Sequence, residues 1–328
     1  MAASSSSTSS SSSSSVAHGL AGRSIASVSD LSSEELIAVL DLADDLKKKQ
    51  HEGQSHRLLP DKTLGMIFQK PSLRTRVSFE SGMTQLGGHA IYLAPSDIKL
   101  GQRETTEDIA IVLSRMVDII MARTFGHDIV EDLVKHADVP VINGLSEREH
   151  PCQILADLQT IRERQARMAG LRVVWSGDGN NVAHSLMYGA ALTGMELFIV
   201  TPPGYEPLDE IVADSRALAV KTGASIHVTN DLQSACKGAH VIYTDVWASM
   251  GQEEEAAERK KTFAPYQVNM RLLENADPSC IILHCLPAHY GDEIDYESSR
   301  SPNSAIFDQA ENRLHAQKAL MVLLAGAG

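Results

Sequence analysis

The stretch LRVVWSGDGNNVAHS, residues 171–185, contains the local pattern that decides the fold class. Its first seven residues form a short apolar run typical of a buried strand. A glycine-containing loop follows, and the asparagines after it open a helix. A strand that leads through a short loop into a helix is the repeating unit of α/β proteins with parallel sheets.

The same alternation of strand and helix extends over most of the chain. In the first half, strands are predicted at residues 63–69, 89–94, 118–123 and 140–143, with helices beginning near Ser72, Thr105 and Asp128. In the second half, strands are predicted at residues 171–177, 196–201, 225–229, 240–245 and 280–285. We therefore expect two doubly wound α/β domains with parallel sheets, which bind ligands beyond the carboxyl ends of their strands.

Three further helices organise the chain around these two series. Apolar residues at helical spacing predict a helix over 31–50 and another over 150–169, and a last helix is expected over 304–324. The second of them lies between the two series of strands, so we expect it to bridge the domains. The expected division is a disordered Ser-rich tail over 1–19, a first domain over 20–157, a second over 158–303 and a C-terminal helical segment over 304–328.

Composition limits the classes of partner. The chain has 328 residues, 43% of them hydrophobic, and 42 Asp and Glu against 29 Lys and Arg, for a net charge of −13. This acidic excess argues against a broad surface for nucleic acid or anionic membranes. Apolar runs are also shorter than the roughly 18 to 20 residues that cross a bilayer. Neither a nucleic acid nor a membrane is therefore expected as a partner.

The cysteines and the N-terminus bear on the compartment. Four cysteines without framework spacing are typical of reduced thiols in a cytosol-like compartment. The first 15 residues, MAASSSSTSSSSSSS, offer too little apolar area to pack. Serine without acidic residues is also found in organelle transit peptides, but Arg23 is the only arginine among the first 50 residues. We expect a cytoplasmic protein, with a mitochondrion or plastid as the alternative.

The stretch FQKPSLRTRVSFE, residues 68–80, predicts an anion site. A strand, a turn and a helix start follow one another, with Ser72 as the predicted N-cap. Backbone N–H groups and the dipole of a helix start attract anions, and arginine binds phosphate through two parallel hydrogen bonds. Arg74, Thr75 and Arg76 stand in the first turn of this helix. The alternative is a solvated helix start with ordinary surface arginines.

Two other stretches place polar side chains at helix starts. EHPCQILADL, residues 149–158, puts Pro151 at the first helical position, His150 just before it and Gln153 in the first turn. In the loop at 177–185, Val182 stands where a dinucleotide fingerprint has its third small residue, so that fingerprint is weak. Its two asparagines suit the carboxylate of a small zwitterion better. For His150 the alternative is an ordinary capping or surface residue.

Two loops of the second series carry groups that could do chemistry. TDVWASMGQEEE, residues 244–255, ends a strand with Asp245, which would need a cationic partner if it is buried. It could equally cap its own loop. ILHCLPAH, residues 282–289, places His284, Cys285 and His289 within six positions, which could indicate a metal site, a reactive thiol or neither.

Taken together, these motifs resemble the aspartate/ornithine carbamoyltransferases over about residues 20–325. Ser-x-Arg-Thr-Arg at 72–76 and His-Pro-x-Gln at 150–153 look like the carbamoyl-phosphate motifs of that family. DVWASMG together with HCLP is characteristic of its ornithine branch. The resemblance makes 20–157 the carbamoyl-phosphate-binding domain and 158–303 the ornithine-binding domain, with the C-terminal helix packing on the first.

The resemblance also implies roles for individual residues. Those expected to bind carbamoyl phosphate are Ser72, Leu73, Arg74, Thr75, Arg76, Lys99, Arg123, His150, Gln153, Cys285, Leu286 and Arg313. Those expected to bind ornithine are Asn181, Asp245, Ser249 and Met250, and those expected to be catalytic are Cys285, Asp245, Arg123 and His150. Two positions depart from the family pattern: Lys99 stands where many members have Gln or His, and Tyr290 stands where Arg is common.

The implied reaction is transfer of the carbamoyl group of carbamoyl phosphate to the side-chain amine of L-ornithine, giving L-citrulline and phosphate. Direct attack by the amine requires no metal, cofactor or covalent intermediate, and the family implies a homotrimer or a multiple of trimers. Two alternatives are a carbamoyltransferase for another acceptor, such as putrescine or an acetylated ornithine, and a non-catalytic α/β regulatory or nucleotide-binding module.

Overall fold

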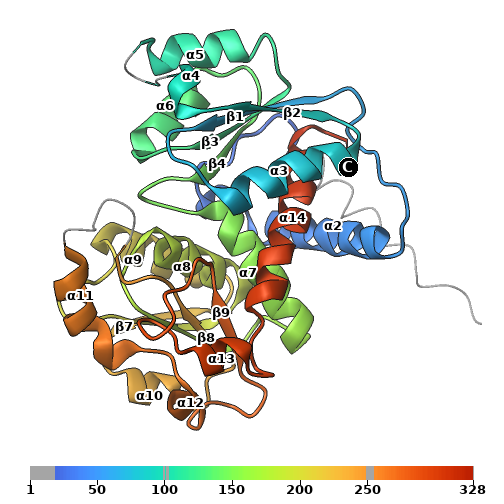
Figure 1. Ribbon diagram of the computed structural model, residues 1–328. Helices are drawn as coiled ribbons and strands as arrows, with labels where there is room; N and C mark the ends of the chain where they lie inside the picture. Colours follow the sequence, from blue (N-terminus) through green and yellow to red (C-terminus); the bar gives the residue numbers. More distant parts are fainter. Residues whose placement is uncertain (1–18, 99, 101–102, 249–254, 328) are drawn as a thin grey trace, which may run out of the picture. The chain divides into compact units, whose positions relative to one another are not determined.

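The computed structural model describes residues 19–98, 100, 103–248 and 255–327. The chain divides into two compact units (Figure 1). Unit 1 comprises Met1–Leu155 and Arg313–Gly328, and unit 2 comprises Ala156–Asn312. Two long helices contribute residues to both units: α7, Pro151–Gln165, and α14, Ile306–Leu324.

Unit 1 is built on a four-stranded parallel sheet in the order β2-β1-β3-β4, with helices on both faces (Figure 1). Its strands are β1 (Thr63–Phe68), β2 (His89–Leu93), β3 (Ile119–Arg123) and β4 (Val141–Leu145). Its helices are η1 (Val28–Asp30), α2 (Ser33–His51), α3 (Leu73–Leu86), α4 (Pro95–Ile98), α5 (Thr106–Leu113) and α6 (His127–His136). The central strands β1 and β3 are almost continuously apolar because both of their faces are covered.

Unit 2 contains a five-stranded parallel sheet in the order β7-β6-β5-β8-β9. Its strands are β5 (Arg172–Ser176), β6 (Glu196–Val200), β7 (Ser225–Thr229), β8 (Val241–Thr244) and β9 (Ile281–His284). Its helices are α8 (Asn181–Thr193), α9 (Asp209–Ala219), α10 (Leu232–Cys236), α11 (Ala256–Phe263), η3 (Ala264–Tyr266), α12 (Met270–Leu273) and α13 (Tyr296–Arg300). Trp175 and Tyr243, from the paired strands β5 and β8, are fully buried and meet edge to face at 5.0 Å.

The prediction of two doubly wound α/β domains with parallel sheets is confirmed. All nine predicted strands are present and differ from the predicted bounds by no more than two residues at either end. Ser32 and Ser72 cap α2 and α3 through hydrogen bonds from backbone N–H groups three residues on. The last helix begins at Ile306, and its C-terminal part belongs to unit 1.

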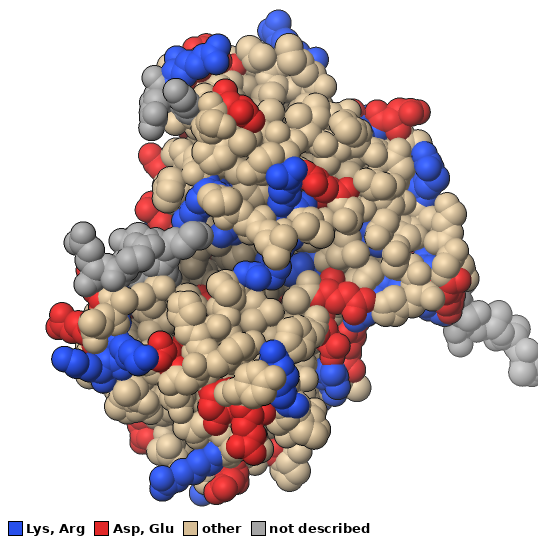
Figure 2. All heavy atoms as spheres, in the orientation of Figure 1, with Lys and Arg blue, Asp and Glu red and all other residues tan. Residues whose placement is uncertain are grey.

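Charged side chains of both signs are interspersed on the face shown in Figure 2. Its described residues therefore present short clusters of Lys and Arg broken by Asp and Glu. Among the helices of the described ranges, none combines the length and the apolar character needed to span a bilayer.

Candidate active site

In each sheet the strand order reverses at one strand, whose two neighbours both follow it in the chain but lie on opposite sides of it. In unit 1, β1 lies between β2 and β3; in unit 2, β5 lies between β6 and β8. Loops that leave the carboxyl ends of strands at such a point diverge and open a crevice for ligands. Of the predicted site residues, Ser72 and Asp245 lie in the loops that follow β1 and β8, Arg123 ends β3, and Asn181 begins the helix after β5.

The loop after β1 in unit 1 leads into the start of α3, where the sequence predicts an anion site. Ser72 is the N-cap of α3, and its hydroxyl accepts a hydrogen bond from the Thr75 backbone N–H at 3.4 Å and donates one to Thr75 Oγ1 at 3.1 Å. Arg123, the last residue of β3, donates to the same Oγ1 at 3.5 Å. Both Thr75 and Arg123 are buried, so the guanidinium is largely withdrawn from water. A cation in this setting is suited to an anionic ligand.

A second buried guanidinium, that of Arg313 on α14, reaches the same hydroxyl within unit 1. Its NH2 group donates to Thr75 Oγ1 at 3.4 Å, and its NH1 group donates to Gln153 Oε1 at 2.8 Å. The hydrogen bond leaves the Gln153 amide oriented with its oxygen toward Arg313. Unit 1 therefore gathers five side chains in one group, here called the Thr75 cluster: Ser72, Thr75, Arg123, Gln153 and Arg313.

His150 is held neutral beside this cluster. It is buried just before the first residue of α7, and its pKa is lowered well below the ordinary value, first by burial and then by the positive charges of Arg313, Arg123, Arg74 and Lys70. A neutral imidazole can donate one hydrogen bond and accept another. His150 is therefore suited to donating a hydrogen bond to an uncharged or anionic oxygen without carrying a charge of its own.

The lowered pKa of His150 predicts a pH dependence of stability. The unfolded chain binds a proton at this histidine below about pH 6.5 while the folded chain does not, so its contribution to stability is present above that pH and lost as pH falls. The free energy of unfolding of His150→Asn, measured by urea denaturation, should therefore fall less steeply from pH 6.5 to 5 than that of the parent. His89→Asn, at an exposed position in β2, is the control. Parallel curves for parent and His150→Asn would contradict this account.

Two arginines of the first turn of α3 have different environments. Arg74 is half-buried and contributes to lowering the pKa of His150. Arg76 is exposed, binds Glu80 at 3.0 Å and lies over the ring of Tyr92 at 3.9 Å. The structure thus orients Arg76 toward its own helix and β2, away from the Thr75 cluster. Leu73, the first residue of α3, is 75% exposed.

Lys70 is a further positive group near Arg123 and His150, and the sequence motifs did not single it out. Burial and the charge of Arg123 lower its pKa, and its ammonium lies 4.7 Å from the centre of the Phe125 ring. The signal was present in the sequence, because Lys70 directly precedes the Pro-Ser turn of FQKPSLRTRVSFE.

In unit 2, Asp245 follows β8 and is the centre of a hydrogen-bonded group. Its carboxylate accepts hydrogen bonds from the Asn180 amide at 3.0 Å, the Cys285 thiol at 2.9 Å and the Val246 backbone N–H at 2.8 Å. These three donors are neutral, whereas the sequence led us to expect a cation. Asn180 also caps α8 through its Oδ1, which accepts from the N–H groups of Val182 and Ala183. Asn180 was thus missed as a residue that orients Asp245.

The loop that contains Cys285 is fixed by its neighbours. Nδ1 of the buried His284 accepts a hydrogen bond from the Leu286 backbone N–H at 2.9 Å, and Nε2 lies 3.0 Å from the carboxylate of Glu293. Leu286 has a positive φ of 59°, a conformation that this hydrogen bond stabilises. Cys285 is half-buried at the carboxyl end of β9. The structure therefore gives His284 the role of shaping the loop.

The same residues bear on the question of a metal. One donor atom from each of Asp245, His284 and Cys285 lies within 4.8 Å of the other two, so His289 is replaced by Asp245 in the group suggested by the sequence. Oxygen, nitrogen and sulfur together could hold a zinc-like cation. Here, however, His284 Nδ1 and the Cys285 thiol are both engaged in hydrogen bonds. The arrangement is therefore explained without a cation.

Four predicted positions need separate comment. Asn181 is the half-buried first residue of α8. Lys99, Ser249 and Met250 lie outside the described residues, as does the N-terminal tail up to residue 18.

The departure at Tyr290 now has a physical account. Its hydroxyl accepts hydrogen bonds from Arg300 at 3.3 and 3.4 Å, and its ring meets that of Tyr296 edge to face. An arginine at this position would place a second guanidinium beside Arg300. The tyrosine is therefore matched to its local partner.

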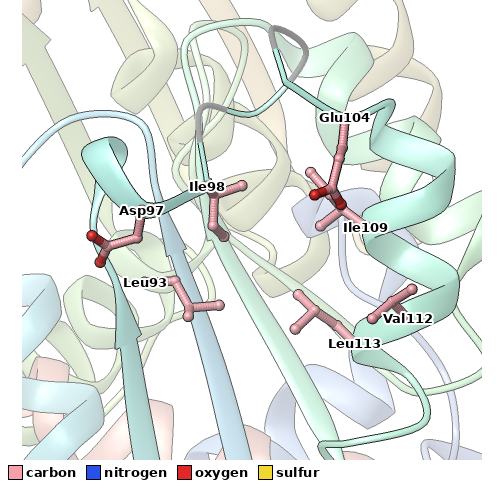
Figure 3. Close-up of a pocket in the computed structure, with 7 residues that line it drawn as sticks. All are labelled: Leu93, Asp97, Ile98, Glu104, Ile109, Val112 and Leu113. Carbon is pink, nitrogen blue, oxygen red and sulfur yellow. The ribbon is translucent and has the colours of Figure 1, made fainter.

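A small pocket in unit 1 lies apart from the Thr75 cluster (Figure 3). It lies between β2, α4 and α5, and apolar side chains line it with two carboxylates at its edge. Its lining residues are Leu93, Asp97, Ile98, Glu104, Ile109, Val112 and Leu113. None of the predicted site residues is among them, so we assign no part of the site to this pocket.

Models of known families match both halves of the chain. Residues 23–163 match the model of the aspartate/ornithine carbamoyltransferase carbamoyl-P binding domain, and residues 169–324 match that of the Asp/Orn binding domain. The chain belongs to the aspartate/ornithine carbamoyltransferase family.

Relatives and solved structures agree on the branch of this carbamoyltransferase. The chain is 54% identical over 307 residues to the ornithine carbamoyltransferase of Thermococcus kodakarensis, an alignment that covers 94% of this chain and 98% of the relative. The structure of ornithine carbamoyltransferase from Pyrococcus furiosus matches with a TM-score of 0.92 at 53% identity, covering 94% of this chain and 98% of the other. A mitochondrial ornithine carbamoyltransferase structure from Coccidioides immitis matches with a TM-score of 0.86 at 33% identity, covering 94% and 99%.

These matches confirm the predicted family, the predicted enzyme class and the assignment to the ornithine branch. In the first half of the carbamoyltransferase, Ser72, Thr75, Arg123 and Gln153 lie within the match to the carbamoyl-P binding domain, whereas their partner Arg313 lies within the other match. The second half, with Asp245 and Cys285, lies within the match to the Asp/Orn binding domain.

Proposed function

We propose that this chain transfers the carbamoyl group of carbamoyl phosphate to the side-chain amine of L-ornithine, giving L-citrulline and phosphate. The observation that carries the proposal is that the two units contain groups of opposite charge. Unit 1 gathers guanidinium groups around Thr75, as a phosphorylated substrate requires. Unit 2 presents the carboxylate of Asp245, as a substrate with an amine requires.

The phosphate would be bound at the start of α3 by Ser72, Leu73, Arg74, Thr75 and Arg76, with Arg123. Their backbone N–H groups and guanidinium groups suit a dianion, and the helix dipole adds to the attraction. Because Arg76 is turned toward Glu80 and Tyr92, its contribution requires a rotation of its side chain. Lys99 remains a proposed ligand on the strength of the resemblance alone.

The carbamoyl group would be polarised by Arg123, His150 and Arg313 and its amide held by Gln153, Cys285 and Leu286. Attack by the amine places negative charge on the carbonyl oxygen, and each positioned donor to such an oxygen contributes about 3 to 4 kcal/mol. A neutral His150 donates to this oxygen without the cost of burying another charge. The bond from carbon to the phosphate oxygen then breaks, and phosphate leaves with the electron pair to the arginines.

Ornithine would be bound by Asn181, Asp245, Ser249 and Met250. Its side-chain amine has an ordinary pKa of about 10.4, so presenting it neutral at pH 7 costs roughly 4 to 5 kcal/mol. Asp245, fixed by three donors, would orient the amine and Cys285 would exchange a proton with it. Attack by the amine, loss of one of its protons and departure of phosphate balance the reaction without a covalent enzyme intermediate.

The Cys285→Ser variant tests the proposed role of the thiol. The hydroxyl keeps a hydrogen bond to Asp245 but exchanges protons differently, so kcat should fall by about a hundredfold and its pH profile should shift. The measurement is citrulline formation from pH 6 to 10, with Cys285→Ala, which removes the hydrogen bond too, expected to be slower still. A Cys285→Ser enzyme with parental rates at every pH would reduce Cys285 to a packing residue.

A steady-state assay with varied acceptors tests the function itself. Carbamoyl phosphate is supplied at saturation with L-ornithine, putrescine, N-acetylornithine or L-aspartate, and the carbamoylated product is measured. We expect L-ornithine to be preferred by at least a hundredfold in kcat/KM, since a site built for a charged group rejects analogues that leave it unpaired. Preference for putrescine or acetylated ornithine would establish the alternative acceptor instead.

We also propose a homotrimer, or a multiple of trimers, located in the cytoplasm. Apolar side chains of unit 1 that are exposed in the single chain, among them Ile91, Val112 and Met116, offer area that an oligomer could bury. None of the four cysteines, all of which lie in the described ranges, forms a disulfide, which suits a reducing compartment. Light scattering on the purified chain and fractionation of cells that express it test these two points.

A further inference from the structure

The further inference concerns Arg259, a buried arginine in unit 2 that the proposed mechanism does not use. Arg259 lies on α11 and is 7% exposed. One of its nitrogens, NH1, donates to the Asp178 carboxylate at 2.9 Å and to the Trp247 backbone carbonyl at 3.0 Å. Its guanidinium also lies 4.9 Å from the centre of the Tyr205 ring. A buried cation that is hydrogen-bonded to several groups holds those groups in fixed positions.

The two hydrogen bonds from Arg259 NH1 join the two loops that hold Asp245, while Nε donates to Glu255 at the start of the same helix at 3.1 Å. Trp247 is two residues beyond Asp245 in the loop after β8, and Asp178 is two residues before Asn180 in the loop after β5. Asn180 donates to the Asp245 carboxylate. Arg259 is therefore hydrogen-bonded to both loops, through Asp178 and Trp247, but not to Asp245 itself.

The loop after β5 has little freedom to reach this position in another way. A Cβ on Gly179 would lie 2.3 Å from the backbone nitrogen of Pro207, so the backbone here packs directly against the segment 205–207. The Gly179 N–H donates to the Tyr205 carbonyl at 2.9 Å, and the Trp175 indole donates to the Asp178 carbonyl at 2.9 Å. With the backbone fixed on both sides, the Asp178 side chain is committed to Arg259.

The electrostatics of Asp178 agree with this geometry. Burial raises the pKa of its carboxyl group and nearby Asp245 raises it as well, whereas Arg259 opposes both. The guanidinium thereby favours the charged form of the Asp178 carboxylate. Without it, the Asp178 carboxylate would be a buried charge lacking its ion-pair partner.

We propose that Arg259 is a positioning residue for the ornithine side of the reaction, acting through Asp178 and the Trp247 carbonyl to hold Asn180 and Asp245 in place. It touches neither the reacting atoms nor the substrate. This inference rests on the proposed function, because it assigns ornithine to Asp245.

The test compares Michaelis constants for the two substrates in the intact enzyme. In Arg259→Met, KM for L-ornithine should rise on the order of tenfold to a hundredfold, since a charge-assisted hydrogen-bonded pair is lost. KM for carbamoyl phosphate should stay within about twofold of the parental value. Arg259→Lys keeps the charge beside Asp178 and should recover part of the ornithine affinity.

Two comparisons separate positioning from simple loss of stability. Arg300→Met removes an exposed arginine of the same unit that also lies over aromatic rings, and both constants should remain parental. Asp178→Asn should raise KM for ornithine. Adding Arg259→Met to Asp178→Asn should raise this KM little further, because both substitutions break the same ion pair.

The outcomes are distinguishable from failure of the proposed function. Parental enzyme that makes no citrulline would remove the proposed function, whatever the variants do. Active parental enzyme with an unchanged ornithine KM in Arg259→Met, or with both constants raised equally in Arg259→Lys, would overturn the positioning role. If Arg259→Met does not fold, Arg259→Lys and Asp178→Asn decide the question by the same ratio of constants.

Discussion

Replacing Arg74 with alanine is expected to lower kcat/KM for carbamoyl phosphate by about three powers of ten, with the fold intact. The reason is the position of this side chain in the first turn of α3, beside the buried Arg123 and His150. A guanidinium that binds phosphate contributes charge-assisted hydrogen bonds, and single donors to a developing charge are worth about a hundredfold to a thousandfold. The measurement is steady-state citrulline formation with carbamoyl phosphate varied.

Two other arginines of unit 1 make this prediction specific. Arg115→Ala changes an exposed arginine that no part of the proposed mechanism uses, and its kinetics should be parental. Arg76→Ala should cost less than Arg74→Ala, because the Arg76 side chain is directed to Glu80 and Tyr92. Near-parental kinetics of Arg74→Ala would remove the helix start of α3 as the phosphate site.

The second large effect is expected at Asp245. Asp245→Asn keeps the size of the side chain but removes the charge that would bind ornithine's amine. We expect kcat/KM for ornithine to fall by about a hundredfold to a thousandfold, the range for losing one partner of a buried charged pair. Binding of carbamoyl phosphate alone, measured by calorimetry, should not change, because its ligands in unit 1 are untouched.

The control for Asp245→Asn is another aspartate of unit 2. Asp277 precedes β9, and the pKa of its carboxyl group is lowered by its hydrogen bonds with Ser279. Asp277→Asn should therefore affect stability slightly and leave both kinetic constants as they are. Loss of carbamoyl-phosphate binding in Asp245→Asn would show that the substitution disturbs more than the ornithine side.

Local patterns in the sequence were sufficient for the strands and for the starts of the main helices. A buried parallel strand must be an apolar run, and a helix start must satisfy its N–H groups, so β1 and the Ser72 cap follow from a few neighbouring residues. The same holds for Pro151 at the first position of α7. In each case the physical requirement is met within one element.

The parts of the site that escaped prediction depend on residues far apart in the chain. Arg76 is directed by Tyr92, which lies on the neighbouring strand β2, and no local pattern announces that contact. Arg259 binds Asp178, 81 positions away, and looks in the sequence like any charged residue of a polar helix. Side-chain direction at such positions is set by packing of the tertiary structure, which periodicity does not report.

Asn180 has a consequence for sequence variation at its position. Its oxygen caps α8 and its amide nitrogen binds Asp245, so a single side chain must be an acceptor at one end and a donor at the other. Aspartate would keep the cap and repel Asp245, serine would keep the cap but be too short for the second bond, and alanine would do neither. Among the twenty amino acids, asparagine alone makes both hydrogen bonds at this length. We therefore expect position 180 to accept another residue only where Asp245 is also replaced.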